Sequence, residues 1–353
     1  MFSSISIAVA LAFTLSTSQA FPTTNISDPS YGPIPGESSS YNSYNGRAPP
    51  FPGNHTAPIL STSQGNPGPD DLLFQNLLSA EWAIFSFYQQ GVEVFTAANF
   101  TEWPNTTYSR IQEIRNNEAG HLRIFQNQIS SNSVKPGACK YNYGFTSAAS
   151  FLALSTIIEI SSMAFLTGLI LQAQTNTTKA VLVAIAETES RHETWGLIDI
   201  WKADPFGGPS DTVFPYANQV LDVTNEFIVP GSCPKENPTY PEPSQHLPQL
   251  SYVSNSTLLA PELPITFSYR NPSLVPNFQE GKDYYAVFFH GLLNISMPFD
   301  TKTNSSMIPK DFENKGVILA VISDVSGAPT EASVLAGPLI ILLQPAELAK
   351  LIY

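Results

Sequence analysis

Residues 151–171 read FLALSTIIEISSMAFLTGLIL, an apolar run with a single charged side chain, Glu159, in its middle. From Phe145 to Gln174 no other side chain is ionisable. The run is about long enough to cross a membrane, and that alternative stays open. Its central glutamate, its scattered Ser and Thr and its polar ends favour instead a helix buried inside a helical bundle. A carboxylate in such a place needs a compensating partner.

The neighbouring stretches have the same helical periodicity. Apolar spacing predicts long helices over 70–97, 105–130, 146–174 and 178–202, and a shorter fifth helix over 211–228. In the first helix, Glu81 lies on the apolar stripe formed by its i±3 and i±4 neighbours. The bundle is therefore expected to bury a second glutamate as well.

The second and fourth helices each carry a Glu-x-x-His motif. Glu118 and His121 form one pair, and Glu189 and His192 form the other, with each pair on one helix face. The remaining histidines have no such setting: His55, His246 and His290. One Glu from each of two helices plus Glu-x-x-His from two others is the ligand set of carboxylate-bridged two-metal sites in four-helix bundles.

The numbering gives an independent check on this constellation. In a helical hairpin, ligands at equal depth must be equally far from the turn. The midpoints of Glu81 with the second-helix pair fall in the predicted loop 99–104, and those of Glu159 with the fourth-helix pair fall in the predicted turn 174–178. All six side chains are therefore expected at one level of the bundle. The stretch 131–145 is long enough to run the length of the bundle, which allows a crossover connection.

Four crowded glutamates would repel one another in a core of low dielectric, and two divalent cations would neutralise them. Oxygen-rich sites with one imidazole per metal suit iron or manganese better than zinc. The alternative is that the glutamates form buried salt bridges with Arg115, Arg123 and Arg191. That alternative assigns no particular place to the histidines.

Three neighbouring residues have simpler interpretations. Glu187 and Glu193 flank the second motif but lie off its face, which favours solvated surface positions. Tyr88 lies seven residues after Glu81 and could donate a hydrogen bond to the site, although a packed core tyrosine is the preferred interpretation.

The rest of the chain indicates an export segment, a leader and a β-rich region. Residues 1–20 resemble a signal peptide with a Ser18-Gln19-Ala20 cleavage pattern, a short membrane anchor being the alternative. Residues 21–67 are rich in Pro and Ser and predict a disordered leader. The helical bundle is assigned to 68–230. Residues 235–353 predict a small β-sandwich-like domain, with strands around 265–269, 284–299, 316–323 and 332–343. The fold class is α+β, multidomain.

The composition of the chain indicates its partners and its cellular compartment. The 353 residues carry a net charge of -13 without a Lys/Arg-rich block, which argues against nucleic acid. Charged residues make up only 13% of the chain, against about 25% in typical soluble domains. In an oxidising compartment Cys139 and Cys233 most simply form one disulfide. Eight sequons indicate glycosylation: Asn25, Asn54, Asn99, Asn105, Asn176, Asn255, Asn294 and Asn304. No transmembrane segment is expected in the mature, secreted or cell-surface chain.

With these motifs in place, the sequence resembles the ferritin-like superfamily over about residues 68–230. More narrowly it resembles the secreted fungal ferritin-like proteins described as late-sexual-development and starvation or stress-response proteins. The resemblance implies metal ligands at Glu81, Glu118, His121, Glu159, Glu189 and His192, with Glu118 and Glu159 less securely assigned as bridging or terminal. Related bundles oxidise ferrous iron, reduce dioxygen or, with manganese, dismutate hydrogen peroxide.

Two functional hypotheses follow. The first is a secreted glycoprotein whose two-metal centre, iron or manganese, performs redox chemistry on dioxygen, peroxide or ferrous ion, so that its partner is a small-molecule oxidant or a metal ion. The second is a non-catalytic extracellular protein of development or stress. There the metal site would be structural or vestigial, and the β domain would bind a cell-wall or protein partner.

Overall fold

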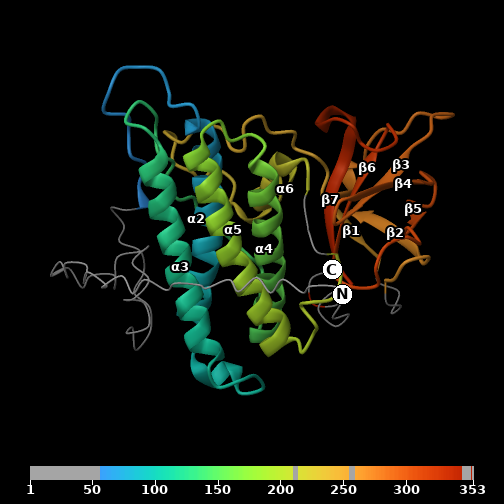
Figure 1. Ribbon diagram of the computed structural model, residues 1–353, viewed down its shortest axis with the longest axis horizontal. Coiled ribbons are helices and arrows are strands. Elements are labelled where there is room, and N and C mark those ends of the chain that lie inside the picture. Colours follow the sequence, from blue (N-terminus) through green and yellow to red (C-terminus); the bar gives the residue numbers. More distant parts are fainter. Residues whose placement is uncertain (1–55, 210–213, 254–258, 344–350, 352–353) are drawn as a thin grey trace, which may run out of the picture.

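The computed structural model describes residues 56–209, 214–253, 259–343 and 351. Within them a group of helices is followed by two antiparallel sheets, which confirms the α+β fold class. The four long helices lie side by side, and the strands form the opposite end of the molecule beyond α6 (Figure 1). The predicted signal peptide, most of the leader and the sequons at Asn25, Asn54 and Asn255 lie outside the described residues.

The four predicted long helices are present with somewhat shorter bounds. They are α2 (Asp71–Val94), α3 (Thr107–Gln128), α4 (Ala148–Leu169) and α5 (Asn176–Trp195). A π-helical turn, η3 (Gly196–Ile200), follows α5 where a continuous helix was expected. The fifth helix, α6 (Ala217–Val223), continues into a 3-10 turn, η4 (Thr224–Phe227).

The hydrogen bonds of two adjacent aspartates at the start of α2 show which helix ends lie together in the bundle. Asp71 accepts hydrogen bonds from the hydroxyls of Ser130 and Ser133, just beyond the end of α3. Asp70 accepts from the backbone N–H of Gln174 at 2.8 Å, in the turn between α4 and α5. The end of α3 and the end of α4 therefore lie at the same end of the bundle, so these two helices run parallel. The segment 129–147 that joins them is a crossover along the bundle.

Backbone pairing, a side-chain hydrogen bond and a disulfide hold this crossover segment against the rest of the protein. Its backbone pairs with Ile59 at Lys135 and with Ile228 at Tyr141. The indole N–H of Trp82 in α2 donates to the carbonyl of Pro136 at 2.9 Å. The predicted disulfide between Cys139 and Cys233 is present and joins the crossover to the chain beyond η4 across 94 residues. Residues 56–67, which the sequence assigns to the leader, include the Ile59 contact.

Helix α4 is a largely buried helix that packs against α5 and α6. Among the described residues it is the one helix long and apolar enough to cross a membrane, and 67% of its most apolar window is buried inside the protein. Three of its hydroxyl groups, those of Ser155, Thr156 and Ser161, donate to backbone carbonyls three or four residues earlier. Its burial is that of a core helix in a bundle.

The β region consists of two antiparallel sheets. One has the order β1-β2-β5 and the other β4-β3-β6-β7. The predicted runs appear as β2 (Pro264–Tyr269), the hairpin β3 (Tyr285–His290) and β4 (Leu293–Pro298), β6 (Val317–Ser323) and β7 (Val334–Leu342). Two strands of three residues, β1 (Leu250–Tyr252) and β5 (Ser305–Met307), were not predicted because they are too short to show a period.

Strands β3, β6 and β7 of the four-stranded sheet are buried on both faces, whereas β4 is exposed or partly exposed. On one face Phe288 and Ala320 pack against the smaller sheet in a shared core. On the other face Phe289 and Leu319 belong to the core of the helical bundle. The ring centroids of Phe289 and Phe214 are 5.3 Å apart. The β region thus shares one core with the bundle and covers its α6 side.

Candidate metal centre

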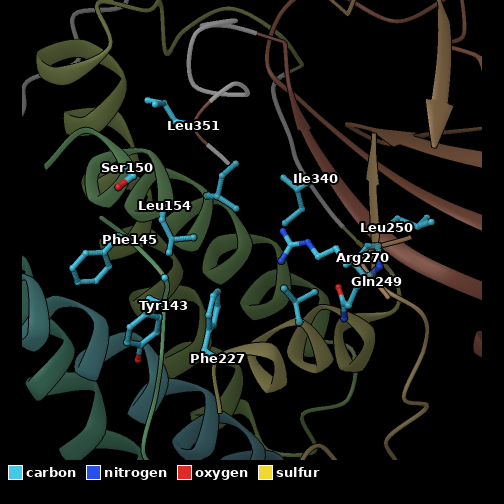
Figure 2. Close-up of a pocket in the computed structure, with 14 residues that line it drawn as sticks. Tyr143, Phe145, Ser150, Leu154, Phe227, Gln249, Leu250, Arg270, Ile340 and Leu351 are labelled. Atoms are coloured by element: carbon cyan, nitrogen blue, oxygen red, sulfur yellow. The ribbon is translucent and has the colours of Figure 1, made fainter. Parts of the chain in front are cut away.

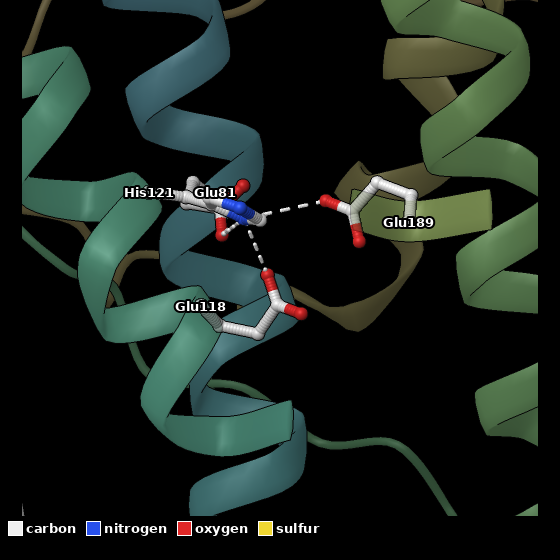
Figure 3. Close-up of side chains that lie close together, drawn as sticks. All are labelled: Glu81, Glu118, His121 and Glu189. Carbon is white, nitrogen blue, oxygen red and sulfur yellow. Dashed lines mark hydrogen bonds and ion pairs between the residues drawn. The ribbon is translucent and has the colours of Figure 1, made fainter. Parts of the chain in front are cut away.

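The structure brings all six predicted ligands into one buried cluster at mid-height of the bundle. Glu81 comes from α2 and Glu159 from α4, while α3 and α5 each supply one Glu-x-x-His pair. None of the six residues is more than 6% exposed. Their ligand atoms form two groups, each within 4.8 Å, made of Glu81, Glu118, His121 and Glu189 and of Glu118, Glu159, Glu189 and His192. Figure 3 shows the first group.

Each imidazole is encircled by three carboxylates. The Nδ1 atom of His121 lies 2.9 Å from Glu118, 3.3 Å from Glu189 and 3.5 Å from Glu81. The Nδ1 atom of His192 lies 3.1 Å from Glu189 and 3.2 Å from both Glu118 and Glu159. The two halves of the cluster therefore repeat the same arrangement.

The four glutamates fall into two classes. Glu118 and Glu189 belong to both groups, whereas Glu81 and Glu159 each belong to one. The two shared carboxylates come from the Glu-x-x-His motifs, and the two peripheral ones come from α2 and α4. The sequence left open which of Glu118 and Glu159 is bridging and which terminal; in the cluster Glu118 is central and Glu159 is peripheral.

Burial separates the acidities of these carboxyls. Burial, reinforced by the neighbouring Glu118 carboxylate, raises the pKa of Glu81 well above its usual value. Burial likewise raises the pKa of Glu159, and the nearby His192 only partly offsets it. Without a metal, burial therefore favours the protonated form of both peripheral carboxyls.

The shared carboxylates and the imidazoles have pKa values shifted in the direction that favours their charged forms. Burial and mutual repulsion act to raise the pKa of Glu118, but His121 and His192 outweigh them and lower it. The pKa of Glu189 is also lowered by the two imidazoles, against the effect of burial. Burial by itself lowers the pKa of His121 and His192, yet the surrounding carboxylates raise it well above 6.5.

The hydrogen bonds of the cluster leave several oxygens without a partner. One N–H at Nδ1 cannot serve the three carboxylates around it. Among the described residues, the Oε1 atoms of Glu81, Glu118 and Glu189 are buried and make no hydrogen bond. Orphaned carboxylate oxygens are costly in a core. The donor set, carboxylate oxygens with one imidazole in each group, therefore fits two cations.

Two polar residues contact the outside of the cluster. The Tyr88 hydroxyl donates a hydrogen bond to Oε1 of Glu159, so the preferred interpretation as a merely packed tyrosine was incomplete. The amide nitrogen of Asn117 lies 3.0 Å from Nε2 of His192. Asn117 could not be predicted from the sequence, because its contact joins α3 to α5 and no spacing within one helix indicates it.

Other predicted neighbours lie at the periphery. Glu187 is exposed and pairs with Arg191 at 3.4 Å, as expected of a surface residue. Glu193 also lies outside the cluster, but it is only partly exposed, and burial raises its pKa to about 7. Arg115 donates to Oε1 of Gln89 at 2.9 Å. The strongest charges acting on the four clustered glutamates come from one another and from the two histidines.

A separate cavity of about 210 Å³ lies between the bundle and the β region. Figure 2 shows Tyr143, Phe227 and Ile340 on its walls and the Arg270 guanidinium at one side. Arg270 forms an ion pair with Glu226. None of the six clustered residues lines this cavity. It is thus distinct from the candidate metal centre.

The glycosylation prediction concerns residues far from this cluster. Among the described sequons, Asn99, Asn105, Asn176 and Asn294 are exposed and Asn304 is partly exposed. Asn99 and Asn105 lie in the connection between α2 and α3, and Asn176 lies at the start of α5. Attachment of sugar at these positions stays a prediction.

A comparison with known families places this site in a recognised fold. Residues 70–197 match the family of ferritin-like domains. The matched stretch contains the four long helices and all six clustered residues, so this part of the chain is similar to ferritin-like domains. A comparison with curated proteins found no match. The narrower resemblance to fungal developmental and stress proteins therefore stays a prediction.

Proposed function

We propose that this ferritin-like domain binds two divalent transition-metal ions between its four long helices. The observation that carries the proposal is the arrangement of three carboxylates around each histidine Nδ1 atom, with buried oxygens left without a partner. In this arrangement Glu81 and His121 belong to one metal position, and Glu159 and His192 belong to the other. Glu118 and Glu189 would be shared by the two positions, since they are common to both groups.

The donor set favours iron or manganese. Four carboxylates and two imidazoles for two cations form an oxygen-rich site, whereas closed zinc sites use mainly Cys and His. The charges also balance, because four ionised glutamates match two divalent ions. A bound pair of such ions supplies reversible one-electron redox chemistry. The protein contributes the ligands, their orientation and a site whose residues are at most 6% exposed.

We extend the proposal to the setting of the protein. The signal-like segment and the sequons support a secreted glycoprotein, and the resemblance supports a role in stress or sexual development. The function would then be redox chemistry on dioxygen, peroxide or ferrous ion. A second candidate is a non-catalytic extracellular protein in which the metals hold the bundle together. The near-complete burial of all six residues favours it, because substrate access needs an open path.

Metal analysis of the full chain, purified without chelator, tests the proposal. We expect two iron or manganese ions per chain in the native protein, and fewer in Glu159→Ala. Glu187→Ala is the matched control, because Glu187 is exposed on α5 and outside the cluster. Protein that contains neither metal after growth in both would overturn the proposal. Peroxide consumption and ferrous oxidation by the metal-loaded protein then separate the enzyme from the structural alternative.

A further inference from the structure

The two Glu-x-x-His motifs occupy equivalent places in the bundle but differ in the residue that precedes them. On α3 the sequence Asn117-Glu118-Ala119-Gly120-His121 places an amide before the motif. On α5 a threonine, Thr188, stands at the same position before Glu189. Because the two halves of the cluster repeat each other, each of these residues occupies the position from which it could approach the histidine of the opposite motif.

Only one of the two residues makes that contact. The Asn117 amide lies 3.0 Å from Nε2 of His192, the ring nitrogen that faces away from the carboxylates. The Thr188 hydroxyl instead donates to the Ala184 carbonyl at 3.2 Å and accepts from Arg191 at 3.0 Å, both within its own helix. Thr188 therefore makes no hydrogen bond to Nε2 of His121. His192 is thus oriented from both sides and His121 from one.

The peripheral glutamates show the same imbalance. Tyr88 lies seven residues after Glu81 on α2, and its hydroxyl donates to Glu159 on α4. The residue seven positions after Glu159 is Leu166, which is buried and has no polar side-chain atom. The Oε1 atom of Glu81, which faces Nδ1 of His121 at 3.5 Å, makes no hydrogen bond among the described residues, and Leu166 offers Glu81 no counterpart to the Tyr88 hydroxyl. Both outer hydrogen bonds therefore act on the Glu159–His192 half of the cluster.

We infer that the two metal positions are unequal, and that Asn117 and Tyr88 are positioning residues that make the Glu159–His192 position the tighter one. The inference rests on the proposed function. Outer hydrogen bonds fix the orientation of metal ligands, and their loss typically weakens binding about 10–100-fold. An asparagine can accept from Nε2–H once Nδ1 binds a metal, because its amide offers both a donor and an acceptor. The Glu81–His121 position lacks this support and releases its ion first.

Chelator competition on the manganese-loaded full chain tests the inference. With increasing chelator, the native protein is expected to lose one ion, hold a plateau near one manganese per chain, and then lose the second at a much higher concentration. In Asn117→Leu and in Tyr88→Phe, the chelator concentration that removes the second ion should fall by about 10–100-fold. The plateau should shorten accordingly. Asn117→Asp should keep the plateau, since a carboxylate also accepts from Nε2–H. Thr188→Val is the matched control and should leave both losses unchanged.

Two further variants identify which position holds the remaining ion. Glu81→Ala should keep the tightly held manganese, and Glu159→Ala should keep only the weakly held one. A native protein that loses both ions together, or Asn117→Leu and Tyr88→Phe proteins that keep the full plateau while their thermal unfolding is unchanged, would overturn the inference. A native chain that binds no manganese or iron would remove the proposed function itself. Equal loss of both ions leaves the proposed function intact.

Discussion

The two helical hairpins of the bundle supply the same ligands from very different sequences. The hairpin α2–α3 carries charged and amide side chains along its length, and the hairpin α4–α5 contains the apolar helix with Glu159 as its only ionisable residue. The reason lies in their surroundings. Helix α4 packs between its partner helices and α6, and the β region covers that side of the bundle. The two hairpins therefore need to repeat only the ligand residues, and the residues around the ligands can differ.

The largest expected effect compares a shared carboxylate with a peripheral one. Glu118 belongs to both groups and Glu81 to one. We therefore expect Glu118→Ala to lose both metal ions and Glu81→Ala to lose one, as measured by metal analysis of the purified proteins. Glu189→Ala should behave like Glu118→Ala because the two residues occupy equivalent places. If Glu118→Ala retained one ion and Glu81→Ala none, the bridging assignment would be reversed.

A second prediction concerns how the stability of the metal-free protein depends on pH. The ligands of the two hairpins should contribute to this dependence in the same direction. Burial raises the pKa of Glu81 and Glu159, so metal-free protein loses stability as pH rises from 4.5 through the raised values. The raised pKa of His121 and His192 acts in the same direction, since that contribution is complete below 6.5 and is lost above it. The lowered pKa values of Glu118 and Glu189 add no slope above pH 5.

Metal-free protein should therefore melt at a lower temperature at pH 9 than at pH 5. Metal-loaded protein should show the opposite trend, because ligands must lose protons to bind a metal and affinity rises with pH. Glu81→Gln and Glu159→Gln should each flatten the slope of the metal-free protein by a similar amount. Differential scanning calorimetry with and without manganese measures both trends. A metal-free melting temperature that rises with pH would contradict this account of the cluster.

The two aspartates at the start of α2 allow a third comparison. Asp71 bonds within the α2–α3 hairpin, and Asp70 bonds between the two hairpins. Asp71 accepts from Gly68, Ser130 and Ser133 and so closes its own hairpin. Asp70 accepts from residues of the α4–α5 turn and so joins the two hairpins. Removing either leaves buried donors without an acceptor, which costs about 1–3 kcal/mol each.

Asp70→Ala and Asp71→Ala should each lower the free energy of unfolding, measured by urea denaturation, by at least about 1–3 kcal/mol. They should differ in the cluster, however. Asp70→Ala loosens one hairpin against the other, and we expect it to weaken manganese retention, whereas Asp71→Ala should not. Asp204→Ala is a suitable control, because Asp204 pairs with Lys315 at an exposed position far along the chain. Equal metal retention in both aspartate variants would show that the hairpins stay docked without Asp70.

Much of this arrangement could be predicted from the sequence, because it depends on spacing within single helices. The i,i+3 motifs and the isolated Glu159 indicate the ligands, and equal distances from two turns indicate their common depth. Asn117 could not be predicted, since its contact depends on how α3 lies against α5. The crossover was allowed by the length of its segment but fixed only by contacts such as that of Asp70 with Gln174. The shared core of bundle and sheet depends likewise on tertiary packing.

The smallest expected effect concerns the surface of α5 beside the second motif. Arg191 and Glu187 form an i,i+4 pair, and both side chains are about two-thirds exposed, at 65% and 67%. Exposed pairs of this kind contribute below about 0.5 kcal/mol. Arg191→Ala should therefore leave stability and manganese retention nearly unchanged, although Arg191 directly precedes His192 in the sequence. A clear loss of metal in Arg191→Ala would mean that the helix surface, and not only its buried face, orients His192, and the difference between the two halves would then need a second cause besides Asn117.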